Sequence, residues 1–282
     1  MKRLGQHFLK NKSALKKIAD ALELKPGDFV IEIGAGHGEL TNELLSLSFE
    51  VLDKKANPKI KIIAVEKDKE LVKILREKFA GDKNVEITEG DAIQTIKKLP
   101  TNIIPQLWYN VSSKKGGGGS LAGFKIVGNI PYYITGHLLR IIGELKNKPE
   151  LCVFTIQKEV AERIAAQPPK MNRLAASVQF WAEPEIVGIL PKKDFEPQPE
   201  VDSAVIKLKT KNEKLKINEM DYYRTVRILF AQPRKTILNN LASAKTENKA
   251  LLAEKLKKIG INPQSRPQNL RVEDIIKTSG LF

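Results

Sequence analysis

The stretch GNIPYYIT, residues 128–135, has side chains that could position a weak nucleophile. Asn129 carries an amide oxygen and Ile130 a backbone carbonyl. Pro131 makes the turn rigid, and Tyr132 offers an aromatic face. The exocyclic amine of a nucleobase is a poor nucleophile, because its lone pair is delocalised into the ring. Acceptors that hold its N–H groups favour attack on an activated methyl group, so these residues predict a methyl-transfer site on a base. The alternative is an asparagine turn beside core tyrosines.

Three further features lie at the ends of predicted strands. A glycine-rich turn begins at Gly34, and Glu66 and Asp91 end the next two strands. The turn allows close approach to a ligand, Glu66 is placed to accept from ribose hydroxyls, and Asp91 from an adenine amine. Glu32, within the first strand, suits an ammonium group. Each feature alone is compatible with a packing turn or a solvated strand end. Together they indicate an adenosine with an amino-acid tail, which describes S-adenosylmethionine.

A second aromatic residue stands in a proline-rich loop, DFEPQPEVDS, residues 194–203. The prolines make this loop stiff and extended. Phe195 is then placed to close over the second face of a flipped base whose first face lies on Tyr132. A loop phenylalanine alone is more often a core residue, but its pairing with Tyr132 favours stacking on a base.

Alternating strands and helices must position these residues. The strands are expected at 29–34, 61–68, 85–92, 124–133, 151–158, 185–190 and 202–209. The first helix is expected to be capped by Ser13. This alternation predicts an α/β fold with a seven-stranded, mostly parallel, Rossmann-like sheet. With the S-adenosylmethionine features at its strand ends, we expect the class I AdoMet-dependent methyltransferase type.

The organisation changes after about residue 211, where basic helical segments replace the alternation. We expect a catalytic AdoMet-binding domain at 1–210 and a small all-helical RNA-binding domain at 211–282. The first domain includes an N-terminal arm at 1–12. It also includes a flexible glycine-rich insertion at 110–123, which enters the fourth strand at the rim away from the site.

The amino-acid composition indicates what kind of molecule the protein binds. The chain has 48 Lys and Arg against 33 Asp and Glu, a net charge of +15, which favours a polyanion such as nucleic acid. One cysteine, Cys152, and three scattered histidines predict no metal site. The sequence has no apolar run long enough to span a membrane and no secretory signal, so we expect a cytoplasmic protein. Without a long heptad run, we expect a monomer.

Taken in order, these motifs resemble the ribosomal RNA adenine N6,N6-dimethyltransferase family. The matching segments are GQHFL, EIGAGHGELT, VEKD, EGDA, GNIPYYIT, QKEVAERI, FEPQPEVDSAVI and RKTILNNL. The resemblance implies that S-adenosylmethionine is held by His7, Leu9, Gly34, Glu66, Asp91 and Asn129, although the family often has Asn at the position of His7. It also implies dimethylation at N6 of two adjacent adenosines near the 3′ end of 16S rRNA, within a pre-30S particle.

The C-terminal segment favours one branch of this resemblance. AQPRKTILNNL and the later GINPQSRPQNL resemble the small-subunit enzymes, which implies that Arg234, Lys235 and Arg266 contact rRNA phosphates. Two alternatives stay open: an Erm-type 23S rRNA dimethyltransferase, and a non-catalytic rRNA-binding assembly factor. A generic NAD-binding protein is excluded, because nothing after the glycine-rich turn would hold a nicotinamide.

Overall fold

The computed structural model describes residues 6–51, 60–98, 124–211, 217–244 and 248–281. The predicted insertion at 110–123 lies outside these residues. The chain forms two compact units, the first Met1–Ala161 with Glu185–Thr210 and the second Glu162–Pro184 with Lys211–Phe282. Residues 162–184 lie within the predicted catalytic domain but pack with the second unit. The functional assignment of 1–210 and 211–282 stays a prediction.

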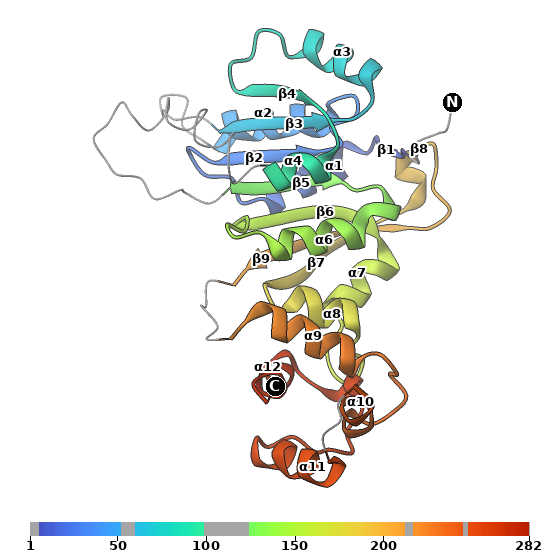
Figure 1. Cartoon of the computed structure of the whole chain (residues 1–282). Helices are drawn as coiled ribbons and strands as arrows, with labels where there is room; N and C mark the ends of the chain where they lie inside the picture. The colour runs from blue at the N-terminus through green and yellow to red at the C-terminus, as the bar shows by residue number, and fades with distance from the viewer. Residues whose placement is uncertain (1–5, 52–59, 99–123, 212–216, 245–247, 282) are drawn as a thin grey trace, which may run out of the picture. The chain divides into compact units, whose positions relative to one another are not determined.

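A seven-stranded sheet confirms the predicted α/β architecture (Figure 1). Its order is β4 (Val85–Glu89), β3 (Lys61–Glu66), β2 (Phe29–Ile33), β5 (Phe124–Asn129), β6 (Leu151–Gln157), β9 (Ser203–Thr210) and β7 (Ala182–Leu190). The first five are parallel, and β9 runs antiparallel to β6. Strands β2 and β5 are buried along nearly their whole length because helices cover both of their faces.

Helices pack on both faces of this sheet (Figure 1). On one face lie α1 (Lys12–Ala21) and α2 (Glu39–Val51), which bury Ile18 and Leu44 against Val30 and Val153. On the other lie α4 (Ala92–Lys98) and α6 (Thr135–Glu144). Among the described residues of this unit, the other α-helices are α3 (Lys69–Lys78) and α7 (Lys158–Ala165), the second of which continues into the second unit. Apolar burial on the two faces is the main force that holds the sheet.

The chain reverses its direction of travel across the sheet between β2 and β5. Strands β3 and β4 follow β2 on one side, while β5 returns to the other side of β2. Ligands of open parallel sheets bind beyond the carboxyl ends of strands at such a reversal. Gly128 makes close approach possible here, because a Cβ on it would lie 2.4 Å from the Ile33 carbonyl oxygen.

A short second sheet joins the N-terminal arm to the proline-rich loop. Strand β1 (Phe8–Leu9) pairs antiparallel with β8 (Phe195–Glu196). The Lys10 N–H donates to the Asp194 carbonyl at 2.9 Å. Neither strand was predicted from the sequence. A two-residue strand is too short to show the alternation by which strands are recognised.

The second unit is helical in its C-terminal part. Its described residues include the α-helices α8 (Arg173–Gln179), α9 (Glu219–Leu229), α10 (Ile237–Ala244), α11 (Lys249–Lys258) and α12 (Val272–Ser279). The Tyr222 ring stacks on Phe180 with centroids 3.9 Å apart, and its hydroxyl donates to the Ala176 carbonyl. Gly260 follows α11 with a φ of 78°, as a C-terminal cap requires.

One predicted helix boundary is wrong. Helix α1 begins at Lys12, and its N-cap is Asn11, whose side chain accepts from the Ala14 N–H. The predicted cap, Ser13, lies inside the first turn and is exposed. Both residue types are good N-caps, so the local sequence alone did not separate them.

The close contact at Gly128 predicts that a substitution that adds a single methyl group there will strongly destabilise the folded protein. Gly128→Ala should lower the free energy of unfolding by roughly 1–3 kcal/mol or more, because the strand has to move away from Ile33. Chemical denaturation of both proteins measures this difference. Gly136→Ala is the control, since a Cβ there meets nothing within 4 Å. That change should stabilise α6 by about 0.5–1 kcal/mol. Equal effects of the two substitutions would contradict the packing argument.

Candidate active site and nucleic-acid surface

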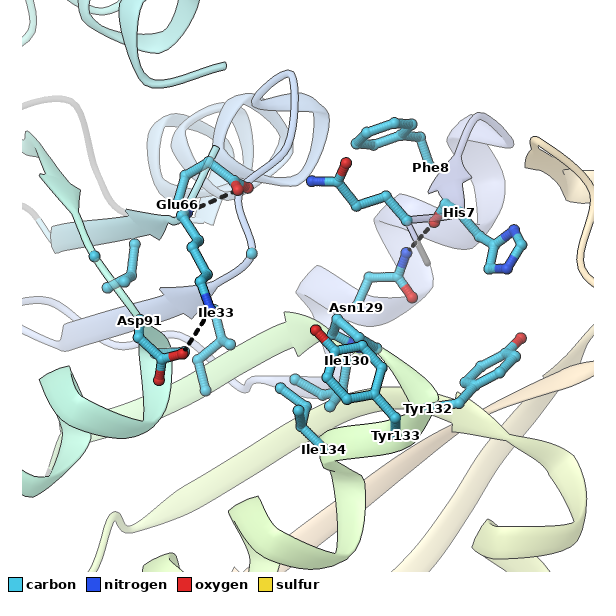
Figure 2. Close-up of a pocket in the computed structure, with 17 residues that line it drawn as sticks. His7, Phe8, Ile33, Glu66, Asp91, Asn129, Ile130, Tyr132, Tyr133 and Ile134 are labelled. Carbon is cyan, nitrogen blue, oxygen red and sulfur yellow. Dashed lines mark hydrogen bonds and ion pairs between the residues drawn. The ribbon is translucent and has the colours of Figure 1, made fainter. Parts of the chain in front are cut away.

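A pocket opens beyond the carboxyl ends of β2, β3, β4 and β5 (Figure 2). It lies wholly within the first unit. The lining residues come from the arm, the glycine-rich turn, the two acidic strand ends and the 129–134 turn: Gln6, His7, Phe8, Ile33, Gly34, Val65, Glu66, Lys67, Gly90, Asp91, Ala92, Asn129, Ile130, Pro131, Tyr132, Tyr133 and Ile134. The structure therefore brings together most of the residues that the sequence predicts for the site.

Asn129 is held in a defined orientation. Its Nδ2 donates to the His7 carbonyl oxygen at 2.6 Å (Figure 2). A carbonyl only accepts, so the amide must present its nitrogen to the arm and direct Oδ1 elsewhere. The Ile130 N–H donates to the Thr155 carbonyl at 3.0 Å, which fixes the following peptide. The two predicted acceptors, on Asn129 and Ile130, thus lie on a turn that is hydrogen-bonded to the arm on one side and to β6 on the other.

The Tyr132 side chain is fixed at both ends. Its hydroxyl lies 3.0 Å from Ser203 Oγ on β9. The His7 ring lies over its face, with centroids 6.0 Å apart and an interplanar angle of 28°. His7 Nδ1 is 2.7 Å from the Pro197 carbonyl oxygen. The aromatic face predicted to receive a base is therefore partly covered by an arm residue.

Glu66 is a rigid carboxylate, buried at the end of β3. Its Oε2 accepts the Gly36 N–H at 2.9 Å, and its Oε1 accepts the N–H groups of Lys67 and Asp68 at 2.7 and 2.9 Å. A carboxylate has about four acceptor positions, so backbone donors fill most of them. A ligand hydroxyl would therefore have to share the Glu66 carboxylate with the backbone N–H groups that it already accepts.

Asp91 lies just after β4 and caps α4. Its Oδ1 accepts the N–H groups of Ile93 and Gln94, and its Oδ2 lies 3.2 Å from Lys67 Nζ. Partial burial would raise the pKa of Asp91, but the hydrogen bonds from Lys67 and the helix N–H groups lower it overall. The carboxylate is therefore anionic at neutral pH, as an acceptor for an amine must be. The sequence did not predict the contact of Lys67, whose ammonium group would compete with an adenine amine for Asp91 Oδ2.

The glycine-rich turn has a left-handed backbone that other residues rarely adopt. Gly34 and Gly36 have φ values of 70° and 60°. The Phe8 ring covers Gly36, where a Cβ would lie 3.0 Å from the ring, and its edge meets His37 with centroids 4.5 Å apart. Phe8 is a second lining residue that sequence reasoning missed, since the matching arm motif drew attention to His7 and Leu9.

Glu32 does not occupy the role predicted for it. It is 1% exposed, lies outside the pocket lining, and accepts from the Thr41 hydroxyl at 2.6 Å. Burial raises its pKa to about 8, and the nearby Glu39 and Glu66 add to the rise while Thr41 opposes it. In this structure the Glu32 carboxyl bonds to Thr41 and does not line the pocket. Its contact instead ties β2 to α2 across the glycine-rich turn.

Two other predicted residues lie outside the pocket lining. Leu9 and Phe195 are each 5% exposed and pair with each other across β1 and β8, in one apolar cluster with Val205. The proposed contact of Leu9 with the cofactor stays a prediction. The proposed role of Phe195 as a cover for a flipped base stays a prediction, and it requires the loop to move this ring out of the cluster.

In the second unit, backbone hydrogen bonds bring the predicted RNA-binding loops together. Arg234 and Lys235 are exposed between α9 and α10. The buried Asn240 side chain holds this loop, since it accepts the Gln232 N–H and donates to the Gln232 carbonyl, both at 3.1 Å. The N–H groups of Ile237 and Leu238 donate to the carbonyls of Ser265 and Pro263. These bonds place the loop of the exposed Arg266 beside the first loop.

The three cations are available to an external anion. Within the part of the chain that the structure describes, Arg234, Lys235 and Arg266 have no carboxylate partner. The Met171 N–H donates to the Gln268 carbonyl at 3.1 Å. The exposed Lys170 therefore also lies next to the 266–269 segment, a neighbour that sequence reasoning did not identify.

Neither a metal centre nor a membrane span is found in the described ranges. These residues contain no group of three or more His, Cys, Asp or Glu side chains that could hold a metal ion. None of their helices is both apolar and long enough to cross a bilayer.

Known proteins resemble this chain over nearly its whole length. A family model described as ribosomal RNA adenine dimethylase matches residues 1–282. A ribosomal RNA small subunit methyltransferase A from Dehalococcoides mccartyi is 38% identical over 275 residues, 97% of this chain and 85% of that relative. One from Moorella thermoacetica is 36% identical over 280 residues, 98% and 90% of the two chains.

Solved structures share the fold. A dimethyladenosine transferase from Plasmodium falciparum has a TM-score of 0.73 at 25% identity, and covers 97% of this chain and 98% of its own. The 23S rRNA methyltransferase ErmE has a TM-score of 0.70 at 24% identity, with the same coverage. At this level of identity the second likeness shows the fold alone.

The buried Glu32 predicts a pH-dependent stability. In the unfolded chain this carboxyl ionises near its usual pKa of 4.5, whereas in the folded chain it keeps its proton to about pH 8. The folded state therefore binds more protons in this window, and stability falls as pH rises through it. Glu32→Gln removes this loss, so its stability relative to wild type should increase by roughly 1–3 kcal/mol from pH 5 to pH 8.

Urea denaturation of both proteins at the two pH values checks this expectation. Thr41→Val is the companion variant, because it removes the donor that favours the anion and should extend the loss to higher pH. A difference between Glu32→Gln and wild type that stays constant with pH would mean that Glu32 ionises normally in the folded protein.

Proposed function

The chain belongs to the ribosomal RNA adenine dimethylase family, and from this we propose that it dimethylates N6 of two adjacent adenosines near the 3′ end of 16S rRNA. Relatives named for the small ribosomal subunit, at 36–38% identity over nearly the full chain, favour this substrate over 23S rRNA. We further propose that it acts in the cytoplasm as a monomer on a pre-30S particle. The observation that carries the catalytic part is the oriented Asn129 amide in the pocket.

The pocket residues fit S-adenosylmethionine by the chemistry of their donors and acceptors. The fold is that of class I AdoMet-dependent methyltransferases. Glu66 would accept from a ribose hydroxyl and Asp91 from the adenine amine. Gly34 allows close approach of the amino-acid tail, and His7 and Leu9 would close the site from the arm. The bound group supplies a methyl on a positively charged sulfur, which needs no further activation.

Asn129 and Ile130 would orient the attacking nitrogen. With Nδ2 tied to His7, Asn129 Oδ1 accepts one N–H of the adenine amine, and the Ile130 carbonyl accepts the other. Two acceptors on one rigid turn point the nitrogen lone pair toward the methyl group and raise the fraction of productive geometries. The group held by Gly34, Glu66 and Asp91 would supply the methyl for the new N–C bond, and the adenine nitrogen would release its proton to water.

Aromatic contacts would hold the flipped base. Tyr132 offers one face, and the adenine would replace the His7 ring that now lies over it. Phe195 is proposed for the other face, after movement of the 194–197 loop. The cost of unstacking the target base is a few kcal/mol, so new stacking on protein rings has to offset a loss of that size.

Methyl transfer to ribosomal particles tests the proposal. Labelled S-adenosylmethionine is offered with undermethylated 30S subunits, with 50S subunits and protein-free 23S rRNA alongside. Label as N6,N6-dimethyladenosine near the 3′ end of 16S rRNA supports the proposal. Label only in 23S rRNA indicates an Erm-type enzyme. Binding to 30S subunits without transfer to any RNA indicates a non-catalytic assembly factor.

Asn129→Ala should reduce turnover far more than cofactor affinity. Loss of one oriented acceptor should lower kcat by about 100-fold or more, while the dissociation constant for S-adenosylmethionine changes by less than about fivefold. Single-turnover transfer and equilibrium binding measure the two quantities. Asn42→Ala, an exposed change on α2, is the control and should match wild type. Near-normal transfer by Asn129→Ala would remove the acceptor role.

Arg234→Ala combined with Lys235→Ala should weaken binding to 30S subunits and flatten its salt dependence. Loss of two phosphate contacts should reduce the slope of log K against log salt by about 1.5. Filter binding at several salt concentrations gives the slope. Lys69→Ala with Arg76→Ala, on α3, removes the same charge as a control. An unchanged slope in the first variant would place the rRNA surface elsewhere.

A further inference from the structure

We propose that Tyr133 is a stacking platform for the nucleobase that neighbours the target adenosine, an inference that rests on the proposed function. Tyr133 is a lining residue of the pocket, yet it is 70% exposed. Single exposed apolar residues are common on protein surfaces, but this ring stands at the mouth of the pocket, next to the predicted acceptors. The position favours a contact with substrate over a chance exposure.

The two adjacent tyrosines are held differently. Both lie in the single turn Tyr132–Ile134, which is closed by the Ile134 N–H donating to the Pro131 carbonyl at 3.0 Å. Their rings diverge from this turn, Tyr132 toward His7 and Tyr133 toward the side of Ile130 (Figure 2). Tyr132 is bonded to Ser203, whereas Tyr133 has no hydrogen-bond or ring partner among the residues that the structure describes. A rigid backbone thus exposes the Tyr133 ring, which makes no such contact with the described part of the protein.

A nucleobase is the ligand that this ring fits. When one base is flipped out, its neighbour loses a stacking partner, and an aromatic side chain can replace it. A base–aromatic stack contributes about tenfold or more to affinity, whichever base is present. The proposed substrate has two adjacent adenosines, so each in turn would be the target and the neighbour. Two tyrosine faces on one turn match two successive bases.

Exposed residues follow Tyr133 at the start of α6. Gly136, in the first turn of α6, is exposed and has no atom within 4 Å of a Cβ position. His137 and Arg140 follow on the exposed side of the same helix. The competing role for Tyr133 is a cover for the cofactor inside the pocket. A covering ring would pack against the pocket wall, whereas most of this ring faces outward.

Substitution of the ring separates these roles. Tyr133→Leu keeps an apolar side chain but removes the aromatic face, while Tyr133→Phe and Tyr133→Trp keep a face. We expect Tyr133→Leu to raise the KM for undermethylated 30S subunits about tenfold. The Phe and Trp variants should stay within about twofold of wild type. The dissociation constant for S-adenosylmethionine should change by less than about twofold in all three. Ile74→Ala, another exposed apolar residue of the same unit, is the control for loss of surface contact.

Two results overturn the inference while leaving the proposed function intact. One is a cofactor dissociation constant that rises in step with the KM, which would make Tyr133 a cofactor cover. The other is a Leu variant that matches wild type in KM while wild type transfers methyl groups normally. A wild-type protein that transfers no methyl to any RNA overturns the proposed function, and this inference with it.

Discussion

The site depends on the close approach of β2 and β5 at Gly128. No Cβ fits between this residue and the Ile33 carbonyl, so the two strands lie in contact and end at the same level. The glycine-rich turn after β2 and the acceptor turn after β5 therefore start side by side, and a Cβ on Gly34 would lie only 3.7 Å from the Asn129 carbonyl oxygen. A donor of methyl groups held by the first turn and a base held by the second would meet at this junction.

The polar groups around the junction are positioned mainly by backbone hydrogen bonds. Glu66 accepts three N–H groups, Asp91 caps α4, and Asn129 donates to a carbonyl of the arm. A group fixed by backbone partners keeps its geometry when no ligand is present, so little ordering entropy is lost on binding. The cost is a limited capacity for new bonds. This limit is most evident at Glu66, where three of about four acceptor positions are filled.

Much of this arrangement was predictable from the sequence, and the failures have physical causes. Apolar runs that alternate with helical segments and end at glycine-rich turns indicate parallel strands. Parallel strands place Glu66, Asp91 and Asn129 at one edge of the sheet. Sequence periodicity gives the face of a residue but not its partner across the fold. Glu32 was therefore assigned to a ligand when its partner is Thr41. The site residues themselves stay predictions, whereas the family membership and the fold are established.

Pairing of the arm with the proline-rich loop ties the earliest part of the chain to one of the last parts of its unit. Leu9 pairs with Phe195, so about 185 residues separate the partners. During synthesis at about 5–20 residues per second, Leu9 would wait roughly 10–40 s for its partner. Strand β9, which completes the sheet beside β6, follows directly after that loop. His7, whose carbonyl accepts from Asn129, directly precedes β1, so the complete set of arm contacts would form only near the end of translation of the unit.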